Sequence, residues 1–80
     1  MNTYHLQYFS LLGDLTKKSS ETLESQAQNP LELYNEIEEL YSFSQAKDHF
    51  RVAINDEFSD WDTPLNNGDR IVFIPPVAGG

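Results

Sequence analysis

Residues 70–80 of the chain read RIVFIPPVAGG, and this stretch decides the fold. Residues 70–74 are almost continuously apolar, which is typical of a central strand that a helix covers on one face and loops cover on the other. Pro75 and Pro76 follow, and because proline fixes φ they predict a stiff, extended exit from the strand. The sequence therefore predicts a strand at the centre of a sheet that leads directly into residues 75–80.

The N-terminal residues have the period of a second strand. Tyr4, Leu6 and Tyr8 alternate with other side chains, which indicates a strand with one face turned inward. A Gly-Asp pair at 13–14 then breaks the pattern. Residues 21–25 read as a short edge strand. Together these segments predict a hairpin whose two strands are joined by a loop of several residues.

Residues 30–41 carry the clearest helix signals in the chain. Asn29 can cap the helix start, Pro30 suits the first helical position, and Glu32 stands three residues after the cap. Apolar side chains then follow at helical spacing, namely Leu33, Ile37 and Leu40. The helix should lay this apolar face on a sheet.

Two further strands are expected between this helix and residue 70. Residues 51–55 place Val52 and Ile54 on one face, and an Asn-Asp turn leads into a short returning strand at 57–59. The element order is then strand, strand, helix, strand, short strand, strand. One helix crossing over the sheet lets the first and last strands pair in parallel at its centre.

This order predicts an α+β fold of the β-grasp type, with a mixed sheet of four to five strands and one main helix packed across it. Ferredoxin-like and other α+β topologies fit the same order. Residues 1–74 should form one domain, which is near the lower limit for a self-sufficient core. Residues 75–80 should form a flexible C-terminal tail.

The chain is strongly acidic. Thirteen Asp and Glu residues against five Lys and Arg residues give a formal net charge of −8. Nucleic-acid binding needs clustered cations, and an anionic membrane would repel the chain, so neither is expected as a partner. The charge either serves solubility or favours a protein partner with a basic docking surface. With no signal peptide and no apolar run long enough to span a membrane, we expect a soluble, cytoplasmic protein.

Ordinary catalytic and metal-binding motifs are absent from the sequence. There is no cysteine, and His5 and His49 lack any ligand spacing, so we expect neither thiolate chemistry nor a metal site. No Gly-x-Ser-x-Gly motif is present. The carboxylates at positions 56–62 lack the spacing of an EF-hand and suit a solvated loop. No bound cofactor is expected.

The last residues offer a different chemistry. Gly79 and Gly80 have no Cβ, so this end of the chain can pass through a constriction that would stop a larger residue. The α-carboxylate of Gly80 is ionised at neutral pH and can attack the α-phosphate of ATP. The acyl-adenylate formed is activated, so sulfide or a persulfide can displace AMP from it. The tail therefore suits the role of a substrate for another enzyme, and the alternative is an ordinary frayed terminus.

The ending at residues 72–80, VFIPPVAGG, closely resembles the C-terminal signature of the small, MoaD-type subunit of molybdopterin synthase, a ubiquitin-like sulfur carrier. Its Phe-x-Pro-Pro-Val-x-Gly-Gly pattern is the most specific part of the resemblance. The likeness covers nearly the whole chain and includes residues 6–9, 29–33, 52–55, 63–65 and 68–69. One departure lies in the first loop, where the family commonly has Arg-Glu and this chain has Gly13-Asp14, so no arginine contact is carried over.

The resemblance implies a mechanism with two partners. An ATP-dependent, ubiquitin-activating-like adenylyltransferase would adenylate Gly80, consuming the ATP itself, and sulfur transfer would convert the adenylate to a thiocarboxylate. The large subunit of molybdopterin synthase would then receive the tail in its active site. There the sulfur would pass to cyclic pyranopterin monophosphate and form the molybdopterin dithiolene, so the small chain would not be catalytic alone. The tail residues that would enter with Gly80 are Pro75, Pro76, Val77, Ala78 and Gly79.

Two other roles stay open. A carrier of the same build could serve thiamine synthesis, tRNA thiolation or protein modification, although the diproline before Val77 favours the molybdenum pathway. A β-grasp interaction module that carries no sulfur is the alternative from a different class of function.

Docking of the tail predicts a partner-binding residue at its root. Either Phe73 with Ile71, or Val72 with Ile74, must face away from the helix. We predict that Phe73 is the interface anchor, because it stands beside the tail root and aromatic residues dominate interface hot spots. The alternative is that Phe73 fills the core beneath the helix.

Overall fold

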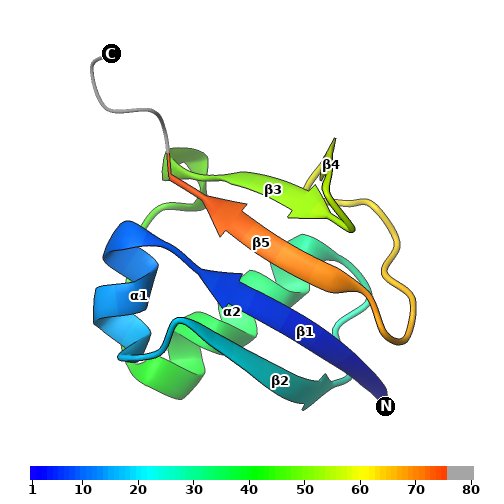
Figure 1. Ribbon diagram of the computed structural model, residues 1–80, viewed down its shortest axis with the longest axis horizontal. Coiled ribbons are helices and arrows are strands. Elements are labelled where there is room, and N and C mark those ends of the chain that lie inside the picture. The colour runs from blue at the N-terminus through cyan, green and yellow to red at the C-terminus, as the bar shows by residue number, and fades with distance from the viewer. Residues whose placement is uncertain (76–80) are drawn as a thin grey trace.

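The computed structural model describes residues 1–75 and shows a five-stranded mixed sheet with a long helix across it (Figure 1). The strand order is β2-β1-β5-β3-β4. In chain order, the elements are β1 (Asn2–Tyr8), α1 (Ser10–Thr16), β2 (Ser20–Ser25), α2 (Pro30–Tyr41), the 3-10 turn η1 (Lys47–His49), β3 (Arg51–Ile54), β4 (Glu57–Ser59) and β5 (Arg70–Ile74). This architecture confirms the predicted β-grasp fold.

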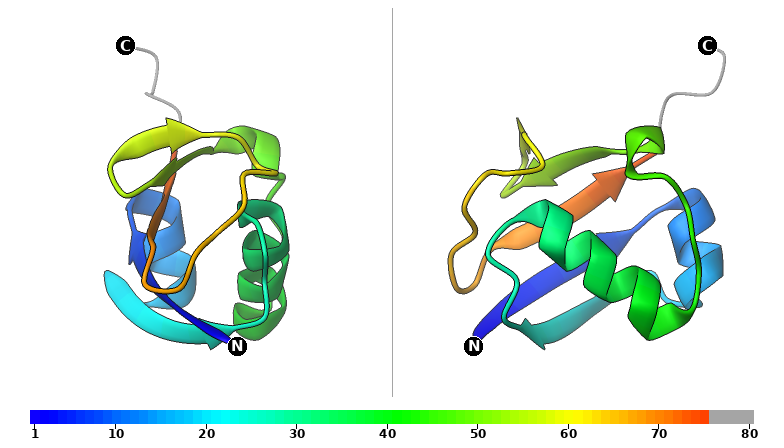
Figure 2. Two further views of the ribbon diagram at one scale, coloured as in Figure 1. Left: turned by 90° about the vertical axis from the view of Figure 1, so that its right-hand side faces the viewer. Right: turned by 180° about the vertical axis from the view of Figure 1, so that it is seen from behind.

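The first and last strands form the centre of the sheet. β5 pairs in parallel with β1, from His5 with Arg70 to Tyr8 with Phe73, and antiparallel with β3 on its other side. Because β1 and β5 are parallel, their carboxyl ends lie at the same edge of the sheet. Helix α2 lies against one face of the sheet (Figure 2), here named the inner face, and the opposite face is named the outer face.

Helix α2 has the predicted bounds, and its start is capped as the sequence indicates. Asn29 Oδ1 accepts a hydrogen bond from the backbone N–H of Glu32 at 2.9 Å. The Glu32 carboxylate in turn accepts one from the backbone N–H of Gln28 at 2.9 Å. These bonds satisfy donors at the helix N-terminus that have no partner inside the helix. The buried residues of α2 are Pro30, Leu33, Tyr34 and Ile37.

The prediction that Leu40 packs on the sheet is wrong, since its side chain is 54% exposed. The buried face of α2 is centred on Tyr34 and Ile37 and extends to the partly buried Tyr41. At 3.6 residues per turn, Leu40 lies at the margin of that face.

A short helix, α1, stands where the sequence predicts a loop between β1 and β2. Leu12 is fully buried, and the Thr16 hydroxyl donates a hydrogen bond to the Leu12 carbonyl at 2.8 Å. Gly13 lies inside this helix, where a Cβ would make only ordinary contacts. A glycine in a helix interior costs about 1 kcal/mol relative to alanine. Burial of Leu12 offsets that cost, so tertiary packing outweighs the local glycine signal.

The core between the inner face and α2 is rich in aromatic rings. Tyr34 on α2 meets the rings of Phe50, Trp61 and Phe73 at centroid distances of 5.8, 5.5 and 5.3 Å. Its hydroxyl donates a hydrogen bond to the Gln45 carbonyl at 2.6 Å, so the polar end of this buried ring is satisfied. This packing holds α2, the residue before β3 and the loop between β4 and β5 around the end of the central strand.

Candidate functional site

The tail predicted to carry the chemistry begins where the central strand ends. β5 ends at Ile74, and the half-buried Pro75 follows at the edge of the sheet where β1 also ends. The other predicted tail residues lie outside the described part of the chain; they are Pro76, Val77, Ala78, Gly79 and Gly80.

The prediction that Phe73 faces away from the helix is wrong. Its side chain is 0% exposed, and its ring stacks on Trp61 at a centroid distance of 5.6 Å with an interplanar angle of 9°. The reason is the register of the central pair, which places Phe73 beside Tyr8, and both side chains are buried on the inner face. Phe73 therefore belongs to the core, and the outward residues at the tail root are Val72 and Ile74.

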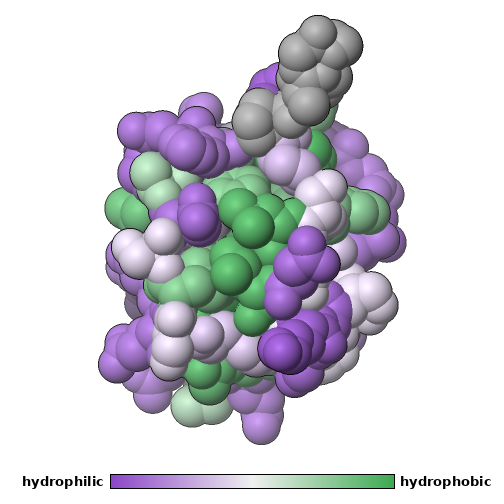
Figure 3. Space-filling model, turned by 90° about the vertical axis from the view of Figure 1, so that its left-hand side faces the viewer, coloured by the Kyte–Doolittle hydropathy of each residue, from purple (hydrophilic) through white to green (hydrophobic). Residues whose placement is uncertain are grey.

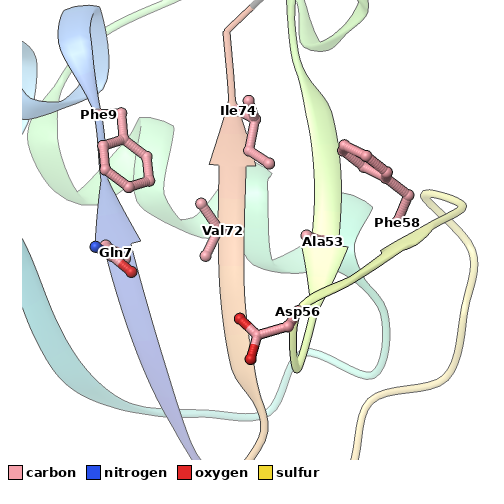
Figure 4. Close-up of a pocket in the computed structure, with 7 residues that line it drawn as sticks. All are labelled: Gln7, Phe9, Ala53, Asp56, Phe58, Val72 and Ile74. Atoms are coloured by element: carbon pink, nitrogen blue, oxygen red, sulfur yellow. The ribbon is translucent and has the colours of Figure 1, made fainter.

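The outer face beside the tail root holds a shallow groove of about 260 Å³ (Figure 4). Loops were expected to cover this side of β5, but the groove is open, and two of its aromatic side chains are exposed. Phe9 is 43% exposed and Phe58 is 59% exposed. The residues that line the groove are Gln7, Phe9, Ala53, Asp56, Phe58, Val72 and Ile74.

The turn between β3 and β4 brings Phe58 to this face. Asn55 and Asp56 both have positive φ, 52° and 73°, as a two-residue hairpin turn requires. The turn sets the register so that Ala53 pairs with Phe58. Because paired residues of neighbouring strands point to the same side, Phe58 shares the outer face with Ala53. The Asn-Asp pair was predicted as the turn of this hairpin, but it was not used to assign Phe58 to a face of the sheet.

The apolar surface continues from the groove toward α1. Figure 3 shows apolar side chains gathered on the end of the molecule where α1 lies. At the junction of β1 and α1, the exposed apolar residues are Phe9 and Leu11, with Leu11 40% exposed. Exposed apolar surface that is continuous over several elements is characteristic of a protein interaction site.

The end of β5 remote from the tail is fixed by a buried carboxylate. Asp69 Oδ1 accepts a hydrogen bond from the side-chain amide of Asn55 at 2.9 Å, and Oδ2 accepts one from the backbone N–H of Asn66 at 2.8 Å. Asn55 also accepts a hydrogen bond from the backbone N–H of Arg70 at 2.9 Å. Both oxygens of Asp69 are engaged in holding two turns together, so this carboxylate is structural.

A second cluster of ionisable groups surrounds Glu21 on β2. Its Oε2 accepts hydrogen bonds from the hydroxyls of Tyr8 at 2.5 Å and Tyr41 at 2.6 Å, and its Oε1 lies 3.3 Å from Lys18 Nζ. Burial alone would raise the pKa of the Glu21 carboxyl, but hydrogen bonds from Tyr41, Tyr8 and Lys18 outweigh burial and hold the pKa below its usual value. Because these partners come from β1, α2 and the segment before β2, the cluster ties the edge strand to the core.

Replacing Glu21 with Gln should lower the free energy of unfolding by about 1.5–3 kcal/mol at pH 7, the usual contribution of hydrogen bonds to a charged group. Folding lowers this pKa, so the stabilisation is present above the pKa of the unfolded chain, about 4.3, and is lost as the pH falls through the folded pKa. Urea unfolding of wild type and Glu21→Gln between pH 7 and pH 3 would measure the difference in their free energies of unfolding. This difference should become smaller below about pH 4.

The matched control for this prediction is Glu24→Gln, because Glu24 is an exposed carboxylate on the same strand. It should change stability little at any pH. A gap between wild type and Glu21→Gln that is the same at pH 3 and pH 7 would contradict the assigned charge state.

Within residues 1–75, no three His, Asp or Glu side chains gather closely enough to hold a metal ion. None of the helices in that range combines the length and apolar character needed to cross a membrane.

Comparisons with known proteins show the family of the chain and solved structures that share its fold. The sequence model of the ThiS family matches residues 6–80. A chain of the Helicobacter pylori complex of molybdopterin-converting factor subunits 1 and 2 is 26% identical, with a TM-score of 0.68, over 98% of this chain and 99% of that one. No curated protein sequence matches the chain.

Two further solved structures share the fold at lower sequence identity. Small archaeal modifier protein 1 from Haloferax volcanii is 15% identical with a TM-score of 0.81, over 96% of this chain and 100% of that one. A chain of the Amycolatopsis orientalis BexX/CysO complex is 20% identical with a TM-score of 0.70, over 96% of this chain and 99% of that one.

Proposed function

The chain belongs to the ThiS family of ubiquitin-like sulfur carriers, and we propose that it is the sulfur-carrying small subunit of a molybdopterin synthase. In this proposal the carboxyl group of Gly80 carries the sulfur as a thiocarboxylate. Each thiocarboxylate passes one sulfur to cyclic pyranopterin monophosphate, bound by the large synthase subunit, and two such transfers form the molybdopterin dithiolene. The small subunit supplies the sulfur, and its partners supply the catalytic side chains.

The observation that carries the proposal is the place of Pro75, directly after the central strand and beside an exposed apolar groove. A segment that starts at this point can reach into a partner that rests on the groove. The 26% identity to a chain of the Helicobacter pylori complex, over nearly the full length of both chains, supports the molybdenum pathway. The paired prolines before Val77 support the same assignment.

The proposed chemistry has two activation steps and one transfer. The carboxylate oxygen of Gly80 attacks the α-phosphate of ATP, which releases pyrophosphate and leaves an acyl-adenylate. Sulfide then displaces AMP and leaves the thiocarboxylate directly. A persulfide displaces AMP to give an acyl disulfide, and a thiol then cleaves its S–S bond, which leaves the thiocarboxylate on Gly80 and a disulfide between the thiol and the former persulfide sulfur carrier. An adenylyltransferase would catalyse the activation, because the α-carboxylate itself resists nucleophilic attack while it is an anion. We propose that these steps take place in the cytoplasm.

The groove would supply the affinity that the tail alone lacks. Holding residues 76–80 in one conformation would cost about 1–2 kcal/mol each, somewhat less for a proline. The total, about 5–10 kcal/mol, has to be offset by contacts elsewhere. Burial of Phe9, Phe58 and Ile74 against a partner would contribute, because these side chains stand exposed or half-exposed around the tail root.

Replacing Phe9 with Ala should weaken binding of the large synthase subunit by about tenfold or more, as expected for an aromatic side chain at an interface. The melting temperature should change little, because Phe9 is 43% exposed in the free chain. Isothermal titration calorimetry with the purified large subunit would measure the affinity.

Leu40→Ala is the matched control, because Leu40 is also an exposed apolar side chain but lies on α2, over the inner face. Its affinity for the large subunit should stay within about twofold of wild type. An equal loss in both variants would show that the groove is not the docking surface.

Reconstitution tests the reaction itself. Chain carrying a thiocarboxylate, mixed with the large synthase subunit and cyclic pyranopterin monophosphate, should yield molybdopterin. If the chain accepts sulfur but gives no molybdopterin, while the same large subunit works with its established small subunit, the chain serves another sulfur pathway such as thiamine synthesis or tRNA thiolation.

A further inference from the structure

Arg51 stands apart from most of the other cations of this acidic chain. Lys18, Lys47 and Arg70 are ion-paired, with Glu21, Asp48 and Asp56 respectively. Within residues 1–75, Arg51 has no carboxylate within ion-pair distance, although the chain carries thirteen acidic residues. An exposed arginine in so acidic a protein would normally find a carboxylate neighbour, so its environment needs another explanation.

The position of Arg51 is at the root of the tail. It is the register partner of Ile74, the last residue of β5 before Pro75. Its guanidinium lies over the ring of Phe58, 3.9 Å from the ring centroid. Both side chains are exposed on the outer face, at the border of the groove.

Packing on Phe58 leaves the guanidinium prepared for a particular kind of contact. A guanidinium that lies over an aromatic ring still has N–H groups that do not face the ring, and these match the two oxygens of a carboxylate. The ring also restricts the rotamers of the arginine before binding, so less conformational entropy is lost when the pair forms.

We propose that Arg51, held on Phe58, is a docking contact that pairs with a carboxylate on the large synthase subunit where the tail enters it. The proposal rests on the proposed function, since it assumes that this subunit is the partner. The surface that fits here is an apolar patch that meets the groove, with an Asp or Glu side chain at the border next to Arg51.

A carboxylate fits this place better than a polyanion does. Asp60 lines the same shallow hollow as Arg51, and Asp56 and Glu57 lie at the far end of the same hairpin. Together these carboxylates would repel an extended phosphate chain. A single partner carboxylate can pair with Arg51 alone, whereas an extended phosphate chain would also lie along the acidic residues of the hairpin. The contact would therefore disfavour nucleic acid, as the net charge of −8 also does, and favour a protein surface that carries one carboxylate beside apolar side chains.

The test is the affinity of the full chain for the purified large synthase subunit in a charge series at position 51. Arg51→Glu should raise Kd by about 30-fold or more, because it sets two carboxylates against each other. Arg51→Gln, which removes the charge without adding repulsion, should raise Kd by about five- to tenfold. Arg51→Lys should lose less, and the difference between wild type and Arg51→Glu should shrink at high salt.

Lys17→Glu provides the matched control. It makes the same change in net charge as Arg51→Glu. The exposed lysine precedes β2, the edge strand at the far end of the strand order from β3 and β4. Its Kd should stay within about twofold of wild type. Melting temperatures of all the variants should stay close to that of wild type, because the substituted side chains are exposed.

The series separates failure of this contact from failure of the proposed function. If wild type binds and Arg51→Glu binds equally well or more tightly, no partner carboxylate faces Arg51. Equal losses in Arg51→Gln and Arg51→Glu would mean that the arginine acts only by packing on Phe58, which also overturns the proposal. If wild type itself does not bind the large subunit, the proposed function is wrong, and so is the proposed contact.

Discussion

Removal of Gly80 should abolish sulfur transfer and leave the folded domain as stable as before. The carboxyl group would then belong to Gly79 and end one residue short, about 3.3–3.6 Å from where the partner active sites require it. A displacement of this size is enough to remove catalysis that depends on positioning. Molybdopterin production should fall to background in the reconstituted reaction.

Thermal unfolding supplies the second half of this prediction. Residue 80 lies beyond the last strand, so its removal should change the free energy of unfolding by no more than about 0.5 kcal/mol. Gly80→Ala, which keeps the carboxyl group in place but adds a Cβ, should retain adenylation better than transfer if the partner passage is narrow. Full sulfur transfer by the shortened chain would contradict the role of Gly80.

Replacing Phe73 with Ala should lower the free energy of unfolding by about 3–5 kcal/mol, the usual range for removal of a buried phenylalanine side chain. Phe73 is fully buried and contacts both Trp61 and Tyr34, so the substitution opens a cavity at the centre of the aromatic core. A domain of this size has only about 4–12 kcal/mol of stability in total. Urea unfolding followed by Trp61 fluorescence would measure the loss.

The neighbouring variant Ile74→Ala shows whether the two faces of β5 are assigned correctly. Ile74 is half-buried on the outer face, so its truncation should cost clearly less stability than that of Phe73. Its affinity for the large subunit should fall, because it lines the groove. If Phe73→Ala is tolerated and Ile74→Ala unfolds the chain, the described orientation of β5 is wrong.

The elements that could be predicted from sequence are those with a clear period or a local cap. The alternation of Tyr4, Leu6 and Tyr8 indicated β1 and its inner face, and all three side chains are buried. The Asn29 cap and Pro30 fixed the start of α2. These signals depend on a few neighbouring residues, so they survive without knowledge of the tertiary structure.

The orientation of β5 could not be predicted, because its residues are apolar on both faces. Nothing local distinguishes Phe73 from Val72, and only the register against β1 decides which of them meets α2. Helix α1 was not predicted for a similar reason, because it is stabilised by burial of Leu12 in the core, which is not a local property of the sequence. Glycine at position 13 suggested a loop, and the packing that overrides it is not a local property.

That Arg51 and Phe58 share one face of the sheet could have been predicted from the sequence. The Asn55-Asp56 turn determines that Phe58 pairs with Ala53, so Phe58 could have been assigned to the face opposite Val52 and Ile54. Arg51 alternates with Val52 and therefore shares that face. The stacking of its guanidinium on the ring also depends on rotamers, which the sequence does not specify.

Mass spectrometry can show directly whether Gly80 is the residue that bears the sulfur. The full chain would be incubated with ATP, the adenylyltransferase and a sulfur source, and its intact mass and C-terminal peptide would be measured. We expect a gain equal to the mass difference between sulfur and oxygen, located on Gly80 and absent when ATP is omitted. An unchanged C-terminal peptide, under conditions in which the enzyme thiocarboxylates its established carrier, would contradict it.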